Sequence, residues 1–292
     1  MRRVARPAPV RTPPGRPSSV TKLPPVRRVA LFHRPECGDA ARTLGSDLRA
    51  SGFSVVTRRD AFRSSKADLI VLLGGDGFLM ETVRALDYPE TPVFGVNFGT
   101  VGFLMNSRTC LDHLVRAVRL RRFLLHDHPV LEARARDVHG RESVNLALND
   151  IVLERQAGQS VRLRLSINDV LFNEFSGDGV IIATPAGSTA YNLAAGGPVV
   201  HPGVPSMVLT PLYPHRAEPF HSLEFSVVVP LVDRLEVAGI ETAKRPIRLL
   251  ADGRILVGID RVRVSDSGKR IRLLHLETHE FIATLSRKFI GE

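Results

Sequence analysis

The N-terminal third of the chain alternates short apolar runs with amphipathic segments. The apolar runs occupy residues 27–33, 53–57, 68–73 and 92–97. The segments between them, residues 39–51 and 77–86, have helical spacing, and Gly52 supplies a C-cap for the first. Strands that alternate with helices predict a parallel sheet, and such sheets bind ligands at the carboxyl ends of their strands.

Beyond residue 128 the pattern changes to short segments rich in β-branched residues and separated by Gly, Asn and Asp. These segments are residues 147–153, 161–167, 180–184, 225–229, 247–250 and 270–274. Their length and spacing predict an antiparallel β domain. Residues 277–290, at the end of the chain, have the pattern of a helix.

These patterns divide the chain into four parts. We expect a disordered, basic, Pro-rich tail at residues 1–26, an α/β domain with a parallel sheet at 27–127, an all-β-rich domain at 128–276 and a C-terminal helix at 277–292. A chain of 292 residues with 43% hydrophobic residues is long enough to bury such cores. It contains no run of 18 apolar residues, so we expect no membrane span.

The net charge of +10 is concentrated in the tail. Residues 1–28 contain eight basic residues and no acidic one, which leaves only +2 for the rest of the chain. The chain beyond residue 28 is therefore close to neutral, which argues against a dedicated nucleic-acid-binding protein. The two cysteines, Cys37 and Cys110, give no disulfide framework, and we expect a reduced, cytoplasmic protein.

The first candidate for chemistry is the segment Gly74-Gly-Asp-Gly77, directly after the apolar run 68–73. Glycines at the carboxyl end of a strand let backbone N–H groups approach a phosphate. Asp76 is out of place beside phosphates unless it accepts a proton or holds a metal. A plain turn is the alternative, because turns use Gly and Asp freely. The segment lacks the lysine of a P-loop, so phosphate charge has to be neutralised by the backbone, by magnesium or from elsewhere.

Two further blocks carry polar or small residues where an apolar strand is expected. Asn149-Asp150 interrupts the segment 147–153, which is costly unless these side chains bind something. An amide suits an adenine edge and a carboxylate accepts from ribose hydroxyls, although a turn or bulge remains open. In residues 177–198, a strand leads into a turn of small residues and a short helix expected to begin at Ser188 or Thr189. Small residues leave room for a flat ligand, on which Tyr191 can stack.

In this order and at this spacing, the blocks resemble the NAD kinase family. Its members carry Gly-Gly-Asp-Gly-Thr, then Gly-x-x-Gly-Phe-Leu, then Asn-Glu, then a Gly-Asp-Gly…Thr-Pro-Thr-Gly-Ser-Thr-Ala-Tyr…Gly-Gly-Pro stretch. The corresponding segments are residues 74–77, 99–104, 149–150 and 177–198, with later matches at 209–215 and 251–253. The resemblance extends from residue 28 to residue 290.

The resemblance implies a kinase that phosphorylates the 2′-hydroxyl of the adenosine ribose of NAD to give NADP. The donor would be ATP with Mg²⁺, or polyphosphate as in some members. It also implies that the C-terminal helix packs on the first domain, that the β-rich domain binds NAD, and that the chain forms a homodimer or homotetramer with NAD near the subunit contacts.

The resemblance also assigns residues to this site. Asp76 would be the catalytic base, with the backbone amides of Gly75 and Gly77 holding phosphate. The other expected substrate- or cofactor-binding residues are Gly74, Phe103, Asn149, Asp150, Asp178, Thr189, Ala190, Tyr191, Asn192, Ala194 and Arg254. Asn149 and Thr189 would read the adenine, Asp150 would bind the ribose, and Asp178 and Ala190 would lie beside the nicotinamide. Tyr191 would pack on the adenosine and Phe103 would wall the pocket; no metal-ligating side chain is expected.

Several positions depart from the family pattern. Phe78 replaces the Thr of the loop, which puts the binding mode of the donor in doubt, and Asp150 replaces a Glu. The other departures are Ala186 for a Thr, Asn192 and Ala194 where serines are common, Ser176 for a basic residue and Arg254 for a Gln. Together they would alter the choice of donor or the preference between NAD and NADH.

Two other functions share part of this pattern. A lipid or sphingoid-base kinase uses the same loop but needs an apolar cavity, which the small and polar residues of 177–198 do not offer. A non-catalytic NAD-binding protein would not need Asp76. Two remaining patterns are expected to be structural: His126-x-His128 lacks the further ligands of a zinc site, and Asp252-Gly253 has the sequence of a hairpin turn.

Overall fold

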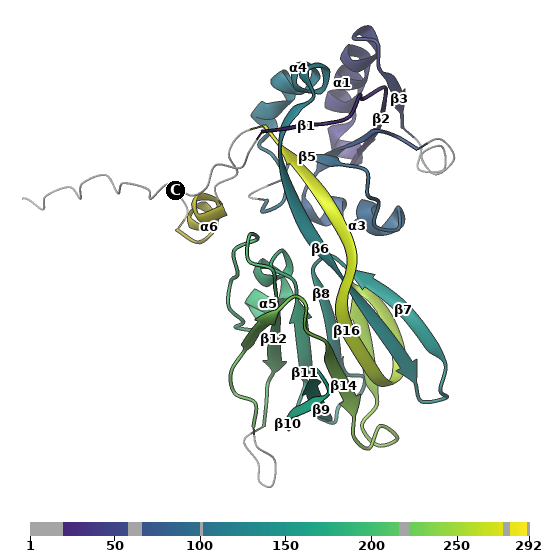
Figure 1. Cartoon of the computed structure of the whole chain (residues 1–292), viewed down its shortest axis with the longest axis vertical. Helices are drawn as coiled ribbons and strands as arrows, with labels where there is room; N and C mark the ends of the chain where they lie inside the picture. The colour runs from purple at the N-terminus through teal and green to yellow at the C-terminus, as the bar shows by residue number, and fades with distance from the viewer. Residues whose placement is uncertain (1–19, 58–65, 100–101, 216–221, 277–280, 291–292) are drawn as a thin grey trace, which may run out of the picture.

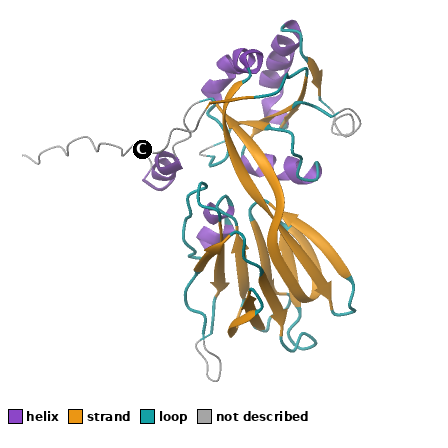
Figure 2. Ribbon diagram, in the orientation of Figure 1, coloured by secondary structure: helices purple, strands orange, loops and turns teal. Residues whose placement is uncertain are grey.

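The computed structural model describes residues 20–57, 66–99, 102–215, 222–276 and 281–290. An α/β part and a β-rich part lie end to end along the long axis, and their strands belong to one continuous sheet (Figures 1 and 2). The fold class predicted from the sequence is confirmed. Within the described ranges, no helix combines the length and the apolar character needed to cross a membrane.

The α/β part contains four parallel strands in the order β5-β4-β2-β3. The strands are β2 (Arg28–His33), β3 (Ser54–Val56), β4 (Leu69–Gly74) and β5 (Val93–Asn97), and the helices are α1 (Gly38–Ala50), α3 (Asp76–Ala85) and α4 (Leu111–Leu120). Every residue of β4 is buried, as an unbroken apolar run in a central strand predicts. The sequence did not predict α4, whose apolar side is nevertheless buried.

The β-rich part consists of antiparallel strands. They are β7 (Glu142–Ala147), β8 (Asp150–Arg155), β9 (Val161–Ile167), β10 (Val170–Gly177), β11 (Gly179–Ala183), β12 (Ser206–Leu212), β13 (Val227–Pro230), β14 (Leu235–Gly239) and β15 (Ile247–Ala251). The single strand predicted over residues 147–153 is wrong. It is two strands, because the N–H groups of Leu148 and Asn149 donate to the carboxylate of Asp252 and not to a neighbouring strand.

Two long paired strands join the parts. β6 (Arg122–Asp137) and β16 (Arg254–His275) run antiparallel from the β-rich part into the α/β part (Figure 1). Near its end β16 also pairs in parallel with β5, where Leu273 lies opposite Val93. The domain boundary expected between residues 127 and 128 therefore falls inside β6, and paired strands take the place of a linker.

Part of the stretch expected to be disordered is ordered. Val20–Lys22 forms β1, which pairs with the start of β6. The next residue, Leu23, is buried, and its N–H donates to the carbonyl of Arg121 at 2.9 Å. Burial of this apolar side chain and the backbone hydrogen bonds offset the entropy lost on ordering. The rest of the tail, residues 1–19, lies outside the described residues.

One apolar cluster is shared by the two parts of the molecule. It contains Phe78 and Phe103 from the α/β part, Leu148 and Ala186 from the β-rich part, and Phe281 from the last helix, α6 (Phe281–Ile290). Each of the first four residues belongs to, or adjoins, one of the sequence blocks described above. Removing these side chains from water therefore draws the blocks to one place.

The hairpin between β15 and β16 fixes the position of residues 148–150. Asp252 and Gly253 form its two-residue turn, with φ of 45° and 80°, as the sequence predicts. The carboxylate of Asp252 accepts hydrogen bonds from the N–H groups of Leu148 (2.7 Å), Asn149 (2.9 Å) and Asp150 (3.4 Å). The hydroxyl of Tyr88 lies 2.9 Å from the same carboxylate and reaches it from beyond α3.

Asp252→Asn is expected to lower the free energy of unfolding by about 1–3 kcal/mol, because one amide oxygen cannot satisfy three N–H donors. Urea denaturation followed by circular dichroism measures the change. Asp169→Asn is the matched control, since Asp169 also has a positive φ (66°) but its side chain is 82% exposed. Equal stabilities of the two variants would show that the carboxylate of Asp252 does not fasten this turn.

Candidate active site

The segment Gly74-Gly-Asp-Gly77 forms the connection between β4 and α3. Gly75 is the N-cap of α3 and Asp76 its first residue, and no side chain caps this end of the helix. The first N–H groups of a helix have no partner within the helix, and the helix dipole adds partial positive charge there. This end of the sheet is therefore suited to an anion such as a phosphate.

Asp76 is held by the segment that follows β5. Its Oδ2 accepts a hydrogen bond from the N–H of Phe103 (2.6 Å) and its Oδ1 one from the N–H of Leu104 (3.3 Å). Gly102 passes so close that a Cβ atom there would lie 2.8 Å from Asp76 Oδ1. Burial raises the pKa of Asp76, while the two backbone hydrogen bonds and the charge of Lys288 oppose the rise. A carboxylate with a raised pKa is a better proton acceptor than one in water.

Phe78 is a core residue at the position where the family has a Thr. Its side chain is 6% exposed and lies in the shared apolar cluster. The guanidinium carbon of Arg34, just after β2, lies 5.6 Å from the centre of its ring, a cation–π contact. The backbone N–H of Arg34 donates to the carbonyl of Leu73 (3.0 Å), so Arg34 lies beside the turn formed by Gly74–Gly77.

Asn149 and Asp150 lie where the chain passes from β7 to β8. Asn149 Oδ1 is buried and has no hydrogen-bond partner among the described residues. A buried amide oxygen without a partner is costly, and a ligand N–H would satisfy it. Asp150 is 8% exposed, and burial together with the nearby charge of Asp252 raises its pKa to about 7.

The small-residue block folds over Asn149. Thr184 Oγ1 donates to the carbonyl of Leu148 (2.6 Å) and accepts from the N–H of Gly187 (3.1 Å). Gly187 lies against Asn149, and a Cβ atom there would collide with the carbonyl of Asn149. Thr184 is not among the site residues predicted from the sequence. The run of small residues that follows it is the sequence feature that indicates this tight turn.

The prediction that a helix begins at Ser188 or Thr189 is wrong. Gly187–Thr189 forms a 3-10 turn, and a single helical turn, α5 (Tyr191–Ala194), follows with Ala190 at its N-cap. The buried hydroxyl of Ser188 donates to the carbonyl of Pro185 (2.7 Å) and accepts from the N–H of Val200 (3.0 Å). This hydroxyl therefore fastens the loop to residue 200 and is not available to cap a helix.

Asp178 and Tyr191 line a cavity of about 440 Å³ beside this loop, together with Glu154 and Arg248. Arg155 Nε lies 3.1 Å from Asp178 Oδ1, so this carboxylate already has a cationic partner. The side chain of Tyr191 is 42% exposed, which leaves its ring accessible for stacking. The pKa of Tyr191 is raised by burial and by the neighbouring Glu154.

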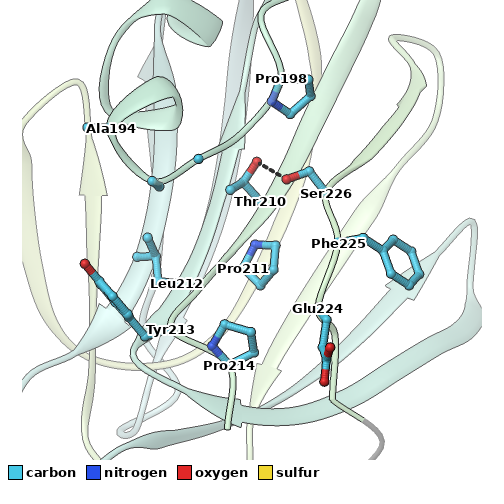
Figure 3. A pocket seen from close by; sticks show the side chains of 12 residues that line it. Ala194, Pro198, Thr210, Pro211, Leu212, Tyr213, Pro214, Glu224, Phe225 and Ser226 are labelled. Carbon is cyan, nitrogen blue, oxygen red and sulfur yellow. Dashed lines mark hydrogen bonds between the residues drawn. The ribbon is translucent and has the colours of Figure 1, made fainter. Parts of the chain in front are cut away.

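Three of the expected ligand-binding residues do not line the cavity of Asp178 and Tyr191. Asn192 is fully buried, and its amide group hydrogen-bonds to Ser188, Pro198 and Thr210, so it holds the loop closed. Ala194 lines a different cavity, of about 720 Å³, over β12 (Figure 3). Arg254 lines a third, of about 250 Å³, beside Arg84.

The described ranges hold no group of three His, Cys, Asp or Glu side chains that could bind a metal ion. His126 of the His-x-His pattern packs edge-on against His275, with ring centres 4.9 Å apart. Burial lowers the pKa of His126, and the charge of His201 adds to this effect.

Two family models match this chain. The ATP-NAD kinase N-terminal domain matches residues 34–119, and the ATP-NAD kinase C-terminal domain matches residues 148–276. The chain belongs to the NAD kinase family. The family predicted from the order of the sequence blocks is thereby confirmed, together with its class of enzyme, a kinase.

Relatives and solved structures agree with this assignment. The NAD kinase of Zymomonas mobilis subsp. mobilis is 34% identical over 227 residues, 76% of this chain and 85% of that protein. The NAD kinase of Aromatoleum aromaticum is 30% identical over 286 residues, 90% of this chain and 92% of that protein. Yeast NADH kinase complexed with NADH has a TM-score of 0.80 at 22% identity, covering 96% of this chain and 92% of that one. An NAD kinase from Archaeoglobus fulgidus in complex with ATP has a TM-score of 0.71 at 22% identity, covering 90% and 97%.

Asp150→Asn is expected to stabilise the ligand-free NAD kinase at alkaline pH. The pKa of Asp150 in the folded protein, about 7, lies above its ordinary value of 3.8, so folding favours the protonated form. The stability that the protonated Asp150 carboxyl contributes is fully present below its ordinary pKa of 3.8 and is lost as the pH rises through about 7. The variant should therefore gain melting temperature over wild type at pH 8 and gain less at pH 5. Asp169→Asn, at an exposed carboxylate, is the control, and an equal gain at both pH values would contradict the raised pKa.

Phe78→Thr, which restores the family's residue, is expected to destabilise the protein by about 3 kcal/mol, because it empties a buried aromatic position. Urea denaturation measures the loss. Phe225→Thr is the control, since Phe225 is 62% exposed and should change stability by less than about 0.5 kcal/mol. If Phe78→Thr were as stable as wild type, Phe78 would not be a core residue.

Proposed function

We propose that this NAD kinase transfers the terminal phosphoryl group of ATP to the 2′-hydroxyl of the adenosine ribose of NAD, giving NADP. The observation that carries the proposal is the position of Asp76. It is a carboxylate with a raised pKa at an anion-binding helix end, and the apolar cluster beside it also packs Leu148 and Ala186, which flank the dinucleotide blocks.

Asp76 would act as the general base. A secondary hydroxyl is a weak nucleophile at neutral pH, and a positioned carboxylate that accepts its proton assists in-line attack on the phosphoryl group. The N–H groups of Phe103 and Leu104 fix the carboxylate but occupy only part of its four lone-pair positions. The first-turn amides of α3, with Gly75 and Gly77 leaving the approach open, would stabilise phosphate charge, and Gly74 makes room for the Phe78 ring.

The acceptor side fits an adenosine. Asn149 Oδ1, which is buried without a partner, would accept from the exocyclic amine of adenine. Ribose hydroxyls donating to Asp150 would favour its charged form and offset the repulsion from Asp252. Tyr191 would stack on the base, Phe103 would wall the pocket, and Thr189 and Ala190 would border it. Asp178, in the cavity it shares with Tyr191, would face the nicotinamide half.

Magnesium would arrive with the donor. Mg²⁺ is commonly held by substrate phosphates and water, and we assign no side chain to it. Bound to the phosphates, the ion would neutralise part of their charge. Polyphosphate is the alternative donor, because the turn contacts phosphate and reads no base. Arg34, held over Phe78, would add positive charge at the position of the missing Thr hydroxyl.

Two further properties belong to this proposal. We infer a cytoplasmic enzyme, since Cys37 and Cys110 are both buried free thiols. We also infer a homodimer or homotetramer. Exposed aliphatic side chains at Ile255 and Val257 lie on β16 and favour contact with a second subunit.

The activity is tested with purified protein, magnesium, ATP or polyphosphate, and NAD or NADH, by coupled detection of NADP or NADPH. Wild type is expected to form product, and Asp76→Asn to lose at least about a hundredfold in kcat, the usual scale of general-base catalysis. Asp39→Asn is the matched control, because Asp39 is the acidic residue in the first turn of α1.

A wild-type protein without product under any donor and acceptor would overturn the kinase function and leave a non-catalytic NAD-binding protein. Product from a lipid or sphingoid base in place of NAD would favour the lipid-kinase alternative. Retention of most activity by Asp76→Asn would show that Asp76 is not the base.

A further inference from the structure

Tyr213, the residue that follows β12, has a strained backbone. Its φ of 43° lies in the left-handed region, which bulky side chains rarely adopt. Pro214 comes next, and the residue before a proline is ordinarily extended. Such a conformation persists only where the surrounding structure imposes it, and it is found most often at functional sites.

The bend at Tyr213 is fastened to the segment that carries Asp178. The N–H of Asp178 donates to the carbonyl of Leu212 (2.8 Å). On the other side of the bend, the N–H of His215 donates to the carbonyl of Ser176 (2.7 Å). The chain passes so close to residue 177, a glycine, that a Cβ atom there would lie 2.9 Å from the carbonyl oxygen of Leu212. The strained residue therefore has a fixed place beside Asp178.

The side chain of Tyr213 stands between two cavities and is 79% exposed. It lines the cavity of about 440 Å³ together with Asp178 and Tyr191, and it also borders the cavity of about 720 Å³ over β12. In Figure 3 its ring extends away from Phe225, which stands on the other side of the larger cavity. A ring that folding leaves so exposed still has apolar surface to bury against a ligand.

Two tyrosines thus border the smaller cavity, and NAD carries two flat ring systems, adenine and nicotinamide. In the proposed function Tyr191 stacks on the adenine, and Asp178 faces the nicotinamide half. Tyr213 lies on the Asp178 side, because the residue before it accepts the hydrogen bond from the N–H of Asp178. The ring of Tyr213 is therefore placed to meet the nicotinamide.

We propose that Tyr213 is a specificity-determining residue, whose ring stacks on the nicotinamide ring of the acceptor dinucleotide. The inference rests on the proposed function, in which NAD is the acceptor and its nicotinamide half faces Asp178. The oxidised nicotinamide ring is flat and cationic, so both stacking and cation–π attraction favour its contact with the face of a tyrosine ring. The strained backbone holds the Tyr213 ring where this contact forms.

The experiment measures the Kd of NAD and of ADP-ribose, which lacks the nicotinamide, by isothermal titration calorimetry. Tyr213→Asn is expected to weaken the binding of NAD by about tenfold, the scale of one stacked ring, and to leave the binding of ADP-ribose unchanged. Asparagine tolerates the left-handed backbone, so the variant removes the ring without disturbing the bend. Tyr213→Phe keeps the ring and should bind NAD as wild type does.

Phe225→Ala is the matched control for the loss of an exposed ring. Phe225 is 62% exposed and lines the larger cavity but not the smaller one. This variant should bind both ligands as wild type does. The melting temperature of each variant confirms folding, and Tyr213→Gly serves if the asparagine variant does not fold, because glycine adopts a positive φ freely.

A second readout uses the three tyrosines of the chain. Nitration by tetranitromethane, located by peptide mass spectrometry, should modify Tyr213 in the free protein. NAD should protect Tyr213, whereas ADP-ribose should leave it reactive. Tyr88 is 5% exposed and donates its hydroxyl to Asp252, so it serves as the unreactive internal reference.

Several results would overturn the inference: an unchanged Kd of NAD in Tyr213→Asn, an equal loss of affinity for NAD and ADP-ribose, or equal protection of Tyr213 by the two ligands. A ring that only contacts a second subunit would give the first of these results. A wild-type protein that binds NAD but forms no NADP would overturn the proposed function instead. The two affinities would then still decide whether Tyr213 recognises the nicotinamide.

Discussion

Phe78, Phe103, Leu148 and Ala186 come from four separate segments of the chain, and their exclusion from water into one cluster brings the chemical groups of the site together. Asp76, Asn149 and Thr184 lie within two residues of Phe78, Leu148 and Ala186 along the chain. Because the cluster spans both parts of the molecule, any loosening between the α/β and β-rich parts would separate Asp76 from Asn149 and Asp150. In the proposed function, packing and catalysis would therefore depend on the same contacts.

The electrostatics of the site follow from that burial. Removing Asp76 and Asp150 from water raises the pKa of both carboxyl groups, and neighbouring groups oppose the rise at Asp76 but add to it at Asp150. Asp76 receives two backbone N–H bonds and the charge of Lys288, whereas Asp150 faces the charge of Asp252 and waits for donors that ribose hydroxyls would supply. Burial of the Asp76 and Asp150 carboxyl groups therefore lowers the stability of the ligand-free protein, and a bound substrate would restore it.

Elements with a strong local signal were predictable. The apolar run of β4 and the helical spacing of α1 were located within one residue, because a central strand and an amphipathic helix leave distinct periodicities. The strands β6 and β16 were not predicted at their full length, since their pattern alternates with charged residues and their partners lie more than a hundred residues apart. The sequence left a turn or bulge open at Asn149-Asp150 but could not decide it, because the cause of the break at Leu148 is the Asp252 carboxylate, which is remote in sequence.

The sequence alone determined the family and the fold class, because an ordered set of Gly-, Asp- and Asn-containing blocks is specific even when each block is weak. Only the tertiary structure decided which of these side chains are already engaged within the protein. It assigned Asn192 to the loop's own hydrogen bonds, made Phe78 a core residue with Arg34 over its ring, and placed Lys288 of the last helix over the ring of Phe103. Spacing along the chain indicates local structure and chemistry. The burial of a side chain, its hydrogen-bond partners and its charged neighbours are decided only when folding brings remote residues together.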